Sequence, residues 1–373
     1  MAELRDAEIL DGGNAVQLSW STGQHARFHT IWLRDNATDA KTRNQSNGQR
    51  LITLADIPKN ISIESATVSG DMLDVRFTSG HETQFASAWL LARIYDNAPA
   101  PKIWPDHATL WCSDLEPQTN TIAALRSDPS ALRNWLHAVV RDGVAIVSGM
   151  ATTSGSLEDV VKLFGHIRET NYGRWFEVRS EVNPSNLAYT NLGLQAHTDN
   201  PYRDPAPGLQ VLACLENTVE GGESAVVDGF AAAETLRREN PQAFELLSAY
   251  PARFEYAGSR GVQLTAKRPI IERGPDGEVI AIRFNNRSMA AVIDIPFDDM
   301  SDWYGALRRL GEIIEAAESQ VCFRLQPGEA FIVDNTRVLH ARTAFSSTGS
   351  RWLQGCYADK DGLVSTLSAL EAA

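Results

Sequence analysis

The stretch "QAHTDNPYRDPAPG", residues 195–208, places a histidine and an aspartate two positions apart, directly before a proline-rich turn. His197 and Asp199 point to the same side of an extended segment, so both side chains can face one metal ion. A chain with 8 histidines and 47 acidic residues often contains such a pair by chance. The pair therefore indicates a metal site only if other parts of the chain provide further ligands.

A third metal ligand lies in "AFIVDNTRVLHART", residues 330–343, where His340 follows an apolar strand and a turn. Two imidazoles and one carboxylate on one face leave coordination positions open, as in non-heme iron(II) oxygenases. Those positions suit a bidentate 2-oxo acid and O2. Arg351, in "SRWLQGCY", and Ser224, in "GGESAVVD", are placed to bind the distal carboxylate of such a cosubstrate.

The segments around these motifs predict strands for most of the chain. The first ninety residues alternate apolar and polar positions in "AVQLSW", "ARFHTIWLRD", "DMLDVRFTSG" and "ETQFASAWL". They predict a small β-rich domain over residues 1–95, with no evident internal repeat. The proline-rich stretch that follows predicts a linker over residues 96–111.

Residues 112–373 predict the larger domain. A helix is expected within "SDPSALRNWLHAVVRDG", residues 127–143, because its apolar positions share one helical face, Ser127 or Asp128 can cap its start, and Gly143 suits its end. From residue 187 onward strands dominate, with helical inserts near 229–248 and 301–318. The expected fold is mostly β with helical inserts: a distorted double-stranded β-helix, or jelly-roll.

Composition narrows the class of protein. The formal charge of −13 argues against a nucleic-acid or anionic-membrane surface. The start of the chain lacks the pattern of a signal peptide, and no apolar run is long enough to span a bilayer. The four cysteines are far apart and predict neither a disulfide framework nor a zinc ribbon. We expect a cytoplasmic enzyme that forms a homodimer.

The stretch "HTDNPYRDPAPGLQVLACLENTVEGGESAVVDGF", residues 197–230, resembles the gamma-butyrobetaine and trimethyllysine hydroxylases, within the taurine-dioxygenase-like iron(II)/2-oxoglutarate enzymes. "TIWLRDNA", residues 30–37, is similar to the N-terminal domain of that family. The resemblance implies iron(II) held by His197, Asp199 and His340, with 2-oxoglutarate and O2 as cosubstrates. Animal members hold a structural zinc through cysteines after this stretch. Here "ATDAKTRNQSNGQR" has none, and His81 lacks cysteine partners, so we predict no structural zinc.

The same resemblance implies a pocket for a small zwitterionic quaternary-ammonium substrate. Aromatic faces bind a trimethylammonium group through cation–π attraction, and the family's cage positions correspond here to Tyr172, Phe176, Tyr189 and Tyr357. The residues expected at the anionic end are Asn186, Asn200, Tyr202, Asn286 and Arg287. Four of them, Asn200, Tyr202, Asn286 and Arg287, offer more donors than two carboxylate oxygens accept, so we expect 2-(trimethylammonio)ethylphosphonate, hydroxylated at C1, as the favoured substrate. The alternative is gamma-butyrobetaine, hydroxylated to L-carnitine.

Two other classes of protein remain open at this point. A zinc hydrolase uses the same ligand types, but it leaves Arg351 and Ser224 unexplained. A non-catalytic quaternary-amine binding protein explains the cage, but not an intact set of metal ligands.

Overall fold

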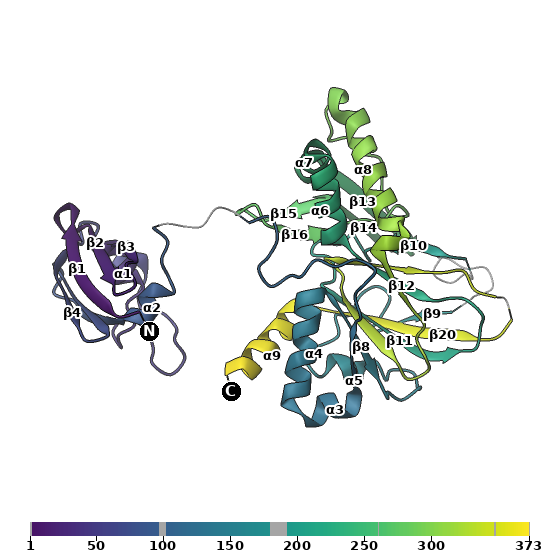
Figure 1. Ribbon diagram of the computed structural model, residues 1–373, viewed down its shortest axis with the longest axis horizontal. Coiled ribbons are helices and arrows are strands. Elements are labelled where there is room, and N and C mark those ends of the chain that lie inside the picture. Colours follow the sequence, from purple (N-terminus) through teal and green to yellow (C-terminus); the bar gives the residue numbers. More distant parts are fainter. Residues whose placement is uncertain (1, 97–101, 180–191, 260, 347, 373) are drawn as a thin grey trace. The chain divides into compact units, whose positions relative to one another are not determined.

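The computed structural model describes residues 2–96, 102–179, 192–259, 261–346 and 348–372 (Figure 1). The chain divides into two units, Met1–Ala100 and Pro101–Ala373. Across the described ranges, we find no helix with both the length and the apolar character that crossing a membrane requires.

The N-terminal unit contains two copies of one motif, a three-stranded sheet followed by a short helix. Strands β1 (Leu4–Leu10), β2 (Ala15–Trp20) and β3 (His25–His29) form an antiparallel sheet that runs into helix α1 (Thr30–Asp35). Strands β4 (Ile63–Ser69), β5 (Met72–Phe77) and β6 (Glu82–Ala86) do the same before helix α2 (Ser87–Leu91). The repeat is visible in "FHTIWL", residues 28–33, and "FASAWL", residues 85–90. The expectation of no internal repeat was therefore wrong.

The strands expected at 26–35 and 82–90 were only partly right, because each segment begins as a strand and continues as a helix. Phe28 and Phe85 are the last but one residues of β3 and β6, and Leu33 and Leu90 lie in the helices that follow. All four side chains are buried in one hydrophobic core. Turning into a helix after each phenylalanine brings the leucine back into that core, and this packing outweighs the strand propensity of the local residues.

His81 has a partner in this unit. Its Nε2 lies 2.9 Å from Oδ2 of Asp39, and the backbone N–H groups of Lys41 and Thr42 donate to Oδ1 of the same aspartate. Hydrogen bonds centred on Asp39 thus tie together the segment in which animal relatives were expected to carry zinc ligands.

Two facing sheets form the centre of the C-terminal unit. The first has the order β7 (Gln118–Thr121), β8 (Val144–Ser148), β18 (Ala330–Asp334), β11 (Leu209–Asn217), β20 (Arg351–Ala358) and β9 (Phe176–Val178). The second has the order β10 (Leu194–His197), β19 (Val338–Arg342), β12 (Ser224–Asp228) and β17 (Gln320–Phe323). Leu212 and Phe331 of the first sheet pack with Val226 and Val338 of the second. This arrangement confirms the predicted jelly-roll.

Helices cover the other face of the six-stranded sheet. They are α3 (Ile122–Ser127), α4 (Pro129–Asp142), α5 (Glu158–Val161) and α9 (Lys360–Ala372). The expected helix is α4: the Asp128 side chain accepts the Ser130 N–H at its start, and Gly143 ends it with φ 77°. Trp135 of α4 and Leu363 of α9 lie in one core with Val211 of β11.

A long insertion between β12 and β17 carries the remaining elements. It contains helices α6 (Gly229–Glu239), α7 (Pro241–Ala249) and α8 (Met300–Glu315), close to the two predicted helical inserts. It also contains the hairpins β13 (Pro251–Ser259) with β14 (Val262–Pro269) and β15 (Ile271–Arg273) with β16 (Val279–Ile282). Figure 1 shows the three helices stacked beside these hairpins.

Much of the segment predicted as a linker is held against the C-terminal unit. The Trp104 indole donates to Glu234 Oε2 at 2.9 Å, and the Trp111 indole donates to the Asp142 carbonyl at 2.6 Å. Trp111 is 7% exposed. Residues 102–111 therefore pack as part of this unit.

Candidate active site

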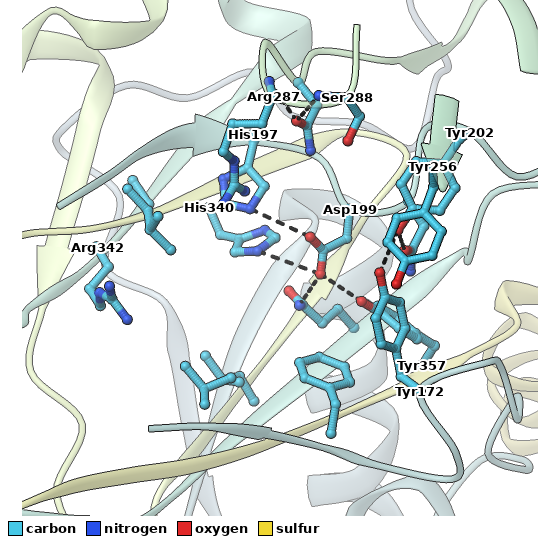
Figure 2. Close-up of a pocket in the computed structure, with 18 of the residues that line it drawn as sticks. Tyr172, His197, Asp199, Tyr202, Tyr256, Arg287, Ser288, His340, Arg342 and Tyr357 are labelled. Atoms are coloured by element: carbon cyan, nitrogen blue, oxygen red, sulfur yellow. Dashed lines mark hydrogen bonds and ion pairs between the residues drawn. The ribbon is translucent and has the colours of Figure 1, made fainter. Parts of the chain in front are cut away.

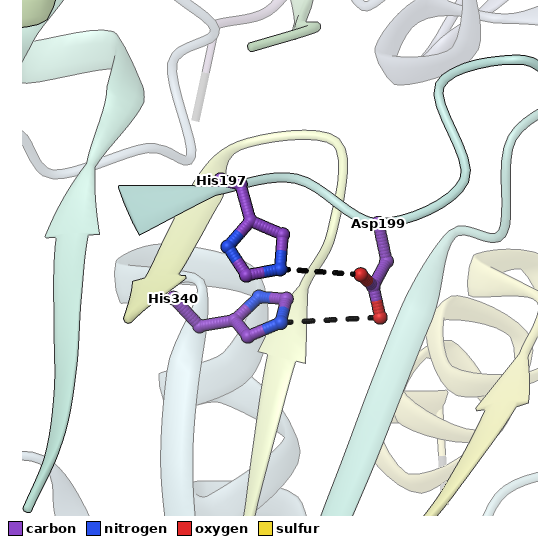
Figure 3. A group of neighbouring side chains, drawn as sticks. All are labelled: His197, Asp199 and His340. Carbon is purple, nitrogen blue, oxygen red and sulfur yellow. Dashed lines mark ion pairs between the residues drawn. The ribbon is translucent and has the colours of Figure 1, made fainter. Parts of the chain in front are cut away.

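Strand register brings the two predicted histidine ligands together. Antiparallel β10 and β19 pair His197 directly with His340, so the two side chains stand side by side with ring centroids 4.4 Å apart. Asp199 follows β10 and turns back toward them (Figure 3). Its Oδ1 lies 3.4 Å from His197 Nε2, and its Oδ2 lies 3.9 Å from His340 Nε2. The three residues offer ligand atoms within 4.8 Å of one another.

The hydrogen bonds and burial of the three residues suit a divalent cation. His197 Nδ1 lies 2.8 Å from the Gln195 carbonyl, which fixes the proton there and leaves Nε2 as the lone-pair atom. Burial lowers the pKa of His340 to about 3, so this imidazole is neutral. Burial opposes ionisation of Asp199, but His340, His197 and the Tyr357 hydroxyl hold the pKa of its carboxyl below the usual value. Two imidazoles and one carboxylate are a ligand set that fits iron(II).

The turn between β18 and β19 fixes the backbone of Asp199. Asn335, 2% exposed, accepts the Asp199 N–H at 2.7 Å and donates to the Asp199 carbonyl at 3.0 Å. It also donates to the Pro207 carbonyl at 2.9 Å. Because the same turn leads into the strand that carries His340, Asn335 links the two halves of the site.

Arg351 and Ser224 line the same cavity as the three ligands. Arg351 is 6% exposed; one of its Nη atoms donates to the Gly222 carbonyl, and its Nε has no hydrogen-bond partner in the described part of the chain. Burial lowers the pKa of Arg351 to about 10, so the guanidinium stays charged at neutral pH. A Cβ on Gly222 would come within 3.0 Å of Arg351 Nε, so this glycine makes room for the guanidinium. A buried cation with an unused donor suits a carboxylate ligand.

The cavity has a volume of about 480 Å³ and a wall of aromatic rings (Figure 2). Tyr172, Phe176 and Tyr357, all predicted cage residues, line it. The rings of Phe176 and Tyr357 are 5.1 Å apart, and those of Tyr172 and Phe176 are 6.3 Å apart at a steep angle. Tyr189, the fourth predicted cage residue, lies outside the described residues, as does Asn186.

Hydroxyl groups connect this wall to Asn200. The hydroxyls of Tyr172 and Tyr202 are 2.8 Å apart, and the Tyr202 hydroxyl donates to Asn200 Oδ1. This fixes Tyr172 as the donor to Tyr202. Asn200 is 4% exposed and has φ 53°; its Nδ2 has no hydrogen-bond partner among the described residues. The cavity thus contains an unused donor at Asn200.

The turn after β16 does not place every predicted residue in the cavity. Arg287 lines it, although its side chain is solvent-exposed. Asn286 is exposed and is not among the lining residues, whereas its neighbour Asn285 is buried and is one of them. The Asn285 side chain accepts the backbone N–H groups of Arg287 and Ser288, and so shapes the turn.

Sequence reasoning missed several lining residues, among them Gln210, Tyr256, Asn285, Ser288 and Arg342. Gln210 carried a usable signal, because it is a lone amide in the apolar run "LQVLACL". Tyr256 had none, since its place depends on how the β13–β14 hairpin folds. There its ring stacks on Tyr202 with centroids 5.1 Å apart.

Comparisons with known proteins agree with this geometry. A family model described as "Taurine catabolism dioxygenase TauD, TfdA family" matches residues 113–357, and "Gamma-butyrobetaine hydroxylase-like, N-terminal" matches residues 8–91. Gamma-butyrobetaine dioxygenase of Pseudomonas sp. (strain AK-1) is 35% identical, with 96% of this chain and 94% of that protein covered. The human protein of the same name is 30% identical, with coverages of 98% and 97%. Mitochondrial trimethyllysine dioxygenase of Gallus gallus is 32% identical, with coverages of 92% and 83%.

These relatives are all named dioxygenases. Their names support neither of the two other protein classes left open by the sequence, a zinc hydrolase and a non-catalytic quaternary-amine binding protein. A solved structure of asparagine oxygenase aligns with 64% of this chain and 82% of its own, at 21% identity and a TM-score of 0.47. The family match covers most of the C-terminal unit and includes the three residues that could hold a metal ion, His197, Asp199 and His340. The chain belongs to the TauD/TfdA family of iron(II)- and 2-oxoglutarate-dependent dioxygenases.

Proposed function

We propose that this dioxygenase hydroxylates a small trimethylammonium zwitterion. One observation carries the proposal: the three predicted metal ligands, a buried arginine and a wall of aromatic rings all line one cavity. A substrate held against the rings would present a C–H bond to the metal side of that cavity. Position would then decide which carbon is hydroxylated.

The metal side would bind the cofactor and cosubstrate. His197, Asp199 and His340 would hold iron(II), and Arg351 and Ser224 would bind the distal carboxylate of 2-oxoglutarate. When bound, iron and 2-oxoglutarate supply the oxidising power: O2 is consumed, the cosubstrate becomes succinate and CO2, and a C–H bond becomes C–OH. The protein's own part is to orient these groups and to keep the imidazole of His340 neutral.

The aromatic side would bind the cation. A trimethylammonium group donates no conventional hydrogen bond, so ring faces are its natural partners, at about 0.5–2 kcal/mol for each ring. Tyr172, Phe176 and Tyr357 offer such faces, and Tyr256 extends the wall toward Tyr202. The names of the relatives support this choice, since gamma-butyrobetaine and trimethyllysine both carry a trimethylammonium group.

The anionic end favours a carboxylate over the phosphonate expected from the sequence. That expectation counted four donor residues, but Asn286 is exposed and the Tyr202 hydroxyl already donates to Asn200. The unused Asn200 amide and Arg287 are left to face an anion. No phosphonate occurs in the names of the relatives. We therefore infer gamma-butyrobetaine as the first candidate substrate and keep 2-(trimethylammonio)ethylphosphonate as the second, for which the cation of Arg287 is the supporting observation.

A competition experiment separates the two candidates. Limiting enzyme is given iron(II), 2-oxoglutarate and equal amounts of both compounds, and mass spectrometry follows the gain of one oxygen by each. We expect gamma-butyrobetaine to be hydroxylated preferentially, and preference for the phosphonate would reverse the order. Arg287→Ala should weaken turnover of either anion, whereas Asn286→Ala, its exposed neighbour, serves as the matched control. Absence of hydroxylation of both compounds by the native enzyme would contradict the proposed substrate class.

A further inference from the structure

Two side chains of the six-stranded sheet hold one oxygen of the Asp199 carboxylate. Gln210 Nε2 donates to Oδ2 at 2.6 Å, and the Tyr357 hydroxyl donates to the same atom at 2.8 Å (Figure 2). The other oxygen, Oδ1, lies 3.4 Å from Nε2 of His197. The two oxygens of this metal ligand are therefore in different surroundings.

The register of the sheet places the two donors together. Gln210 of β11 and Tyr357 of β20 are direct cross-strand partners, so their side chains project from the same face. They are 2% and 4% exposed, and neighbouring strands hold both backbones. Buried side chains on paired strands form a more rigid support than loop residues.

We propose that Gln210 and Tyr357 are positioning residues that fix the Asp199 carboxylate so that Oδ1 alone is presented to the iron. The inference rests on the iron site of the proposed function, but not on its substrate. Hydrogen bonds to an ionised carboxylate are stronger than neutral ones, and turning the Asp199 side chain would break both. A fixed carboxylate binds through one oxygen and leaves the remaining coordination positions to 2-oxoglutarate and O2.

Tyr357 has two separable parts under this proposal. Its ring lies 5.1 Å from that of Phe176 and belongs to the aromatic wall, whereas its hydroxyl reaches the metal ligand. Tyr357→Phe removes only the hydroxyl and keeps the ring in place. Gln210→Met keeps the length of the side chain and removes its donor.

The test measures iron binding without turnover. Anaerobic titration with iron(II) in the presence of 2-oxoglutarate follows the visible charge-transfer band for the native protein and for both variants. Tyr172→Phe is the matched control, because it removes a cavity hydroxyl that bonds Tyr202 instead of Asp199. Thermal unfolding of the metal-free proteins checks that each variant is folded.

Each variant should bind iron(II) about 10- to 100-fold more weakly than the native protein, as is usual when a group supporting a metal ligand is lost. The band maximum should shift, because the carboxylate is free to change its binding mode, and the control should bind like the native protein. A purely structural role would lower the unfolding temperature without shifting the band. Native iron affinity in either folded variant, or equal weakening in Tyr172→Phe, would overturn the proposal. If the native protein itself gives no band, the iron site of the proposed function fails instead.

Discussion

Gly355→Ala should displace one ring of the aromatic wall, while the polar side chains that line the cavity stay unchanged. Gly355 lies in β20 directly opposite Phe176 in β9, and the Phe176 ring lies across the glycine. A Cβ at position 355 would lie 2.3 Å from Cζ and 2.5 Å from Cε2 of that ring. A methyl group at Gly355 therefore cannot coexist with the present position of the ring.

The size of the effect follows from these distances. Carbon atoms in contact lie about 3.5–4.0 Å apart, so the ring must move by more than about 1 Å. Overpacking of this kind costs about 1–3 kcal/mol of stability. If a quaternary ammonium substrate loses one ring face, it loses about 0.5–2 kcal/mol, which is about a 2- to 30-fold rise in its Michaelis constant.

Steady-state hydroxylation of gamma-butyrobetaine and thermal unfolding are the assays. Gly305→Ala is the matched control, because nothing lies within 4 Å of the added Cβ in helix α8, and it should leave the Michaelis constant unchanged. Phe176→Leu lacks the ring, so adding Gly355→Ala to it should have little further effect. A native Michaelis constant and native stability in Gly355→Ala would refute the assigned place of Phe176.

Three further predictions concern the metal, the cosubstrate and the packing of the segment that precedes the jelly-roll. His340→Ala should abolish both the anaerobic charge-transfer band and hydroxylation, and either signal at native strength would remove His340 from the iron site. Arg351→Lys keeps the charge but loses the planar fork, so the half-saturating concentration of 2-oxoglutarate should rise by a larger factor than that of the substrate; steady-state titration of each compound checks this. The hydrogen bond from Arg237, followed by those from Trp104 and Arg238, lowers the pKa of Glu234 to about 2. The stability that this carboxylate contributes is therefore present above pH 4.5 and is lost as the pH falls toward 2. Glu234→Gln should cost about 1 kcal/mol at pH 7 and flatten the acid dependence, as measured by urea unfolding at several pH values.

The features that were predicted correctly rest on sequence patterns within a few neighbouring residues. Helix α4 was predicted because its first and last turns are marked by Asp128 and Gly143, each of which acts within a few residues of its own position. The three residues that lie together as candidate metal ligands were singled out because His197 and Asp199 form a short motif and His340 follows a recognisable strand and turn.

The register of the strand pairs could not be predicted from the sequence. The pairing of His197 with His340, and of Gln210 with Tyr357, joins residues more than a hundred positions apart. No local pattern states which residue of one strand faces which residue of another. For this reason Tyr357 was predicted only as a ring of the cage, and its bond to Asp199 was not foreseen.

The remaining wrong predictions concern the conformation of turns and the positions at which strands end. Whether Asn285 or Asn286 faces the cavity depends on the backbone of one turn, in which the Asn285 side chain bonds to the two residues that follow the pair. In the N-terminal unit, the aromatic and β-branched residues of "FHTIWL" favour a strand locally, but burial of Leu33 requires a helix.

Hydroxylation under labelled oxygen tests the central claim most directly. The native enzyme, loaded with iron(II), is supplied with 2-oxoglutarate, gamma-butyrobetaine and ¹⁸O₂, and mass spectrometry records product and succinate together. The account predicts a product that contains one oxygen atom derived from O2, with one succinate formed for each product molecule. Succinate formation with no labelled product from gamma-butyrobetaine or any other trimethylammonium zwitterion would contradict it.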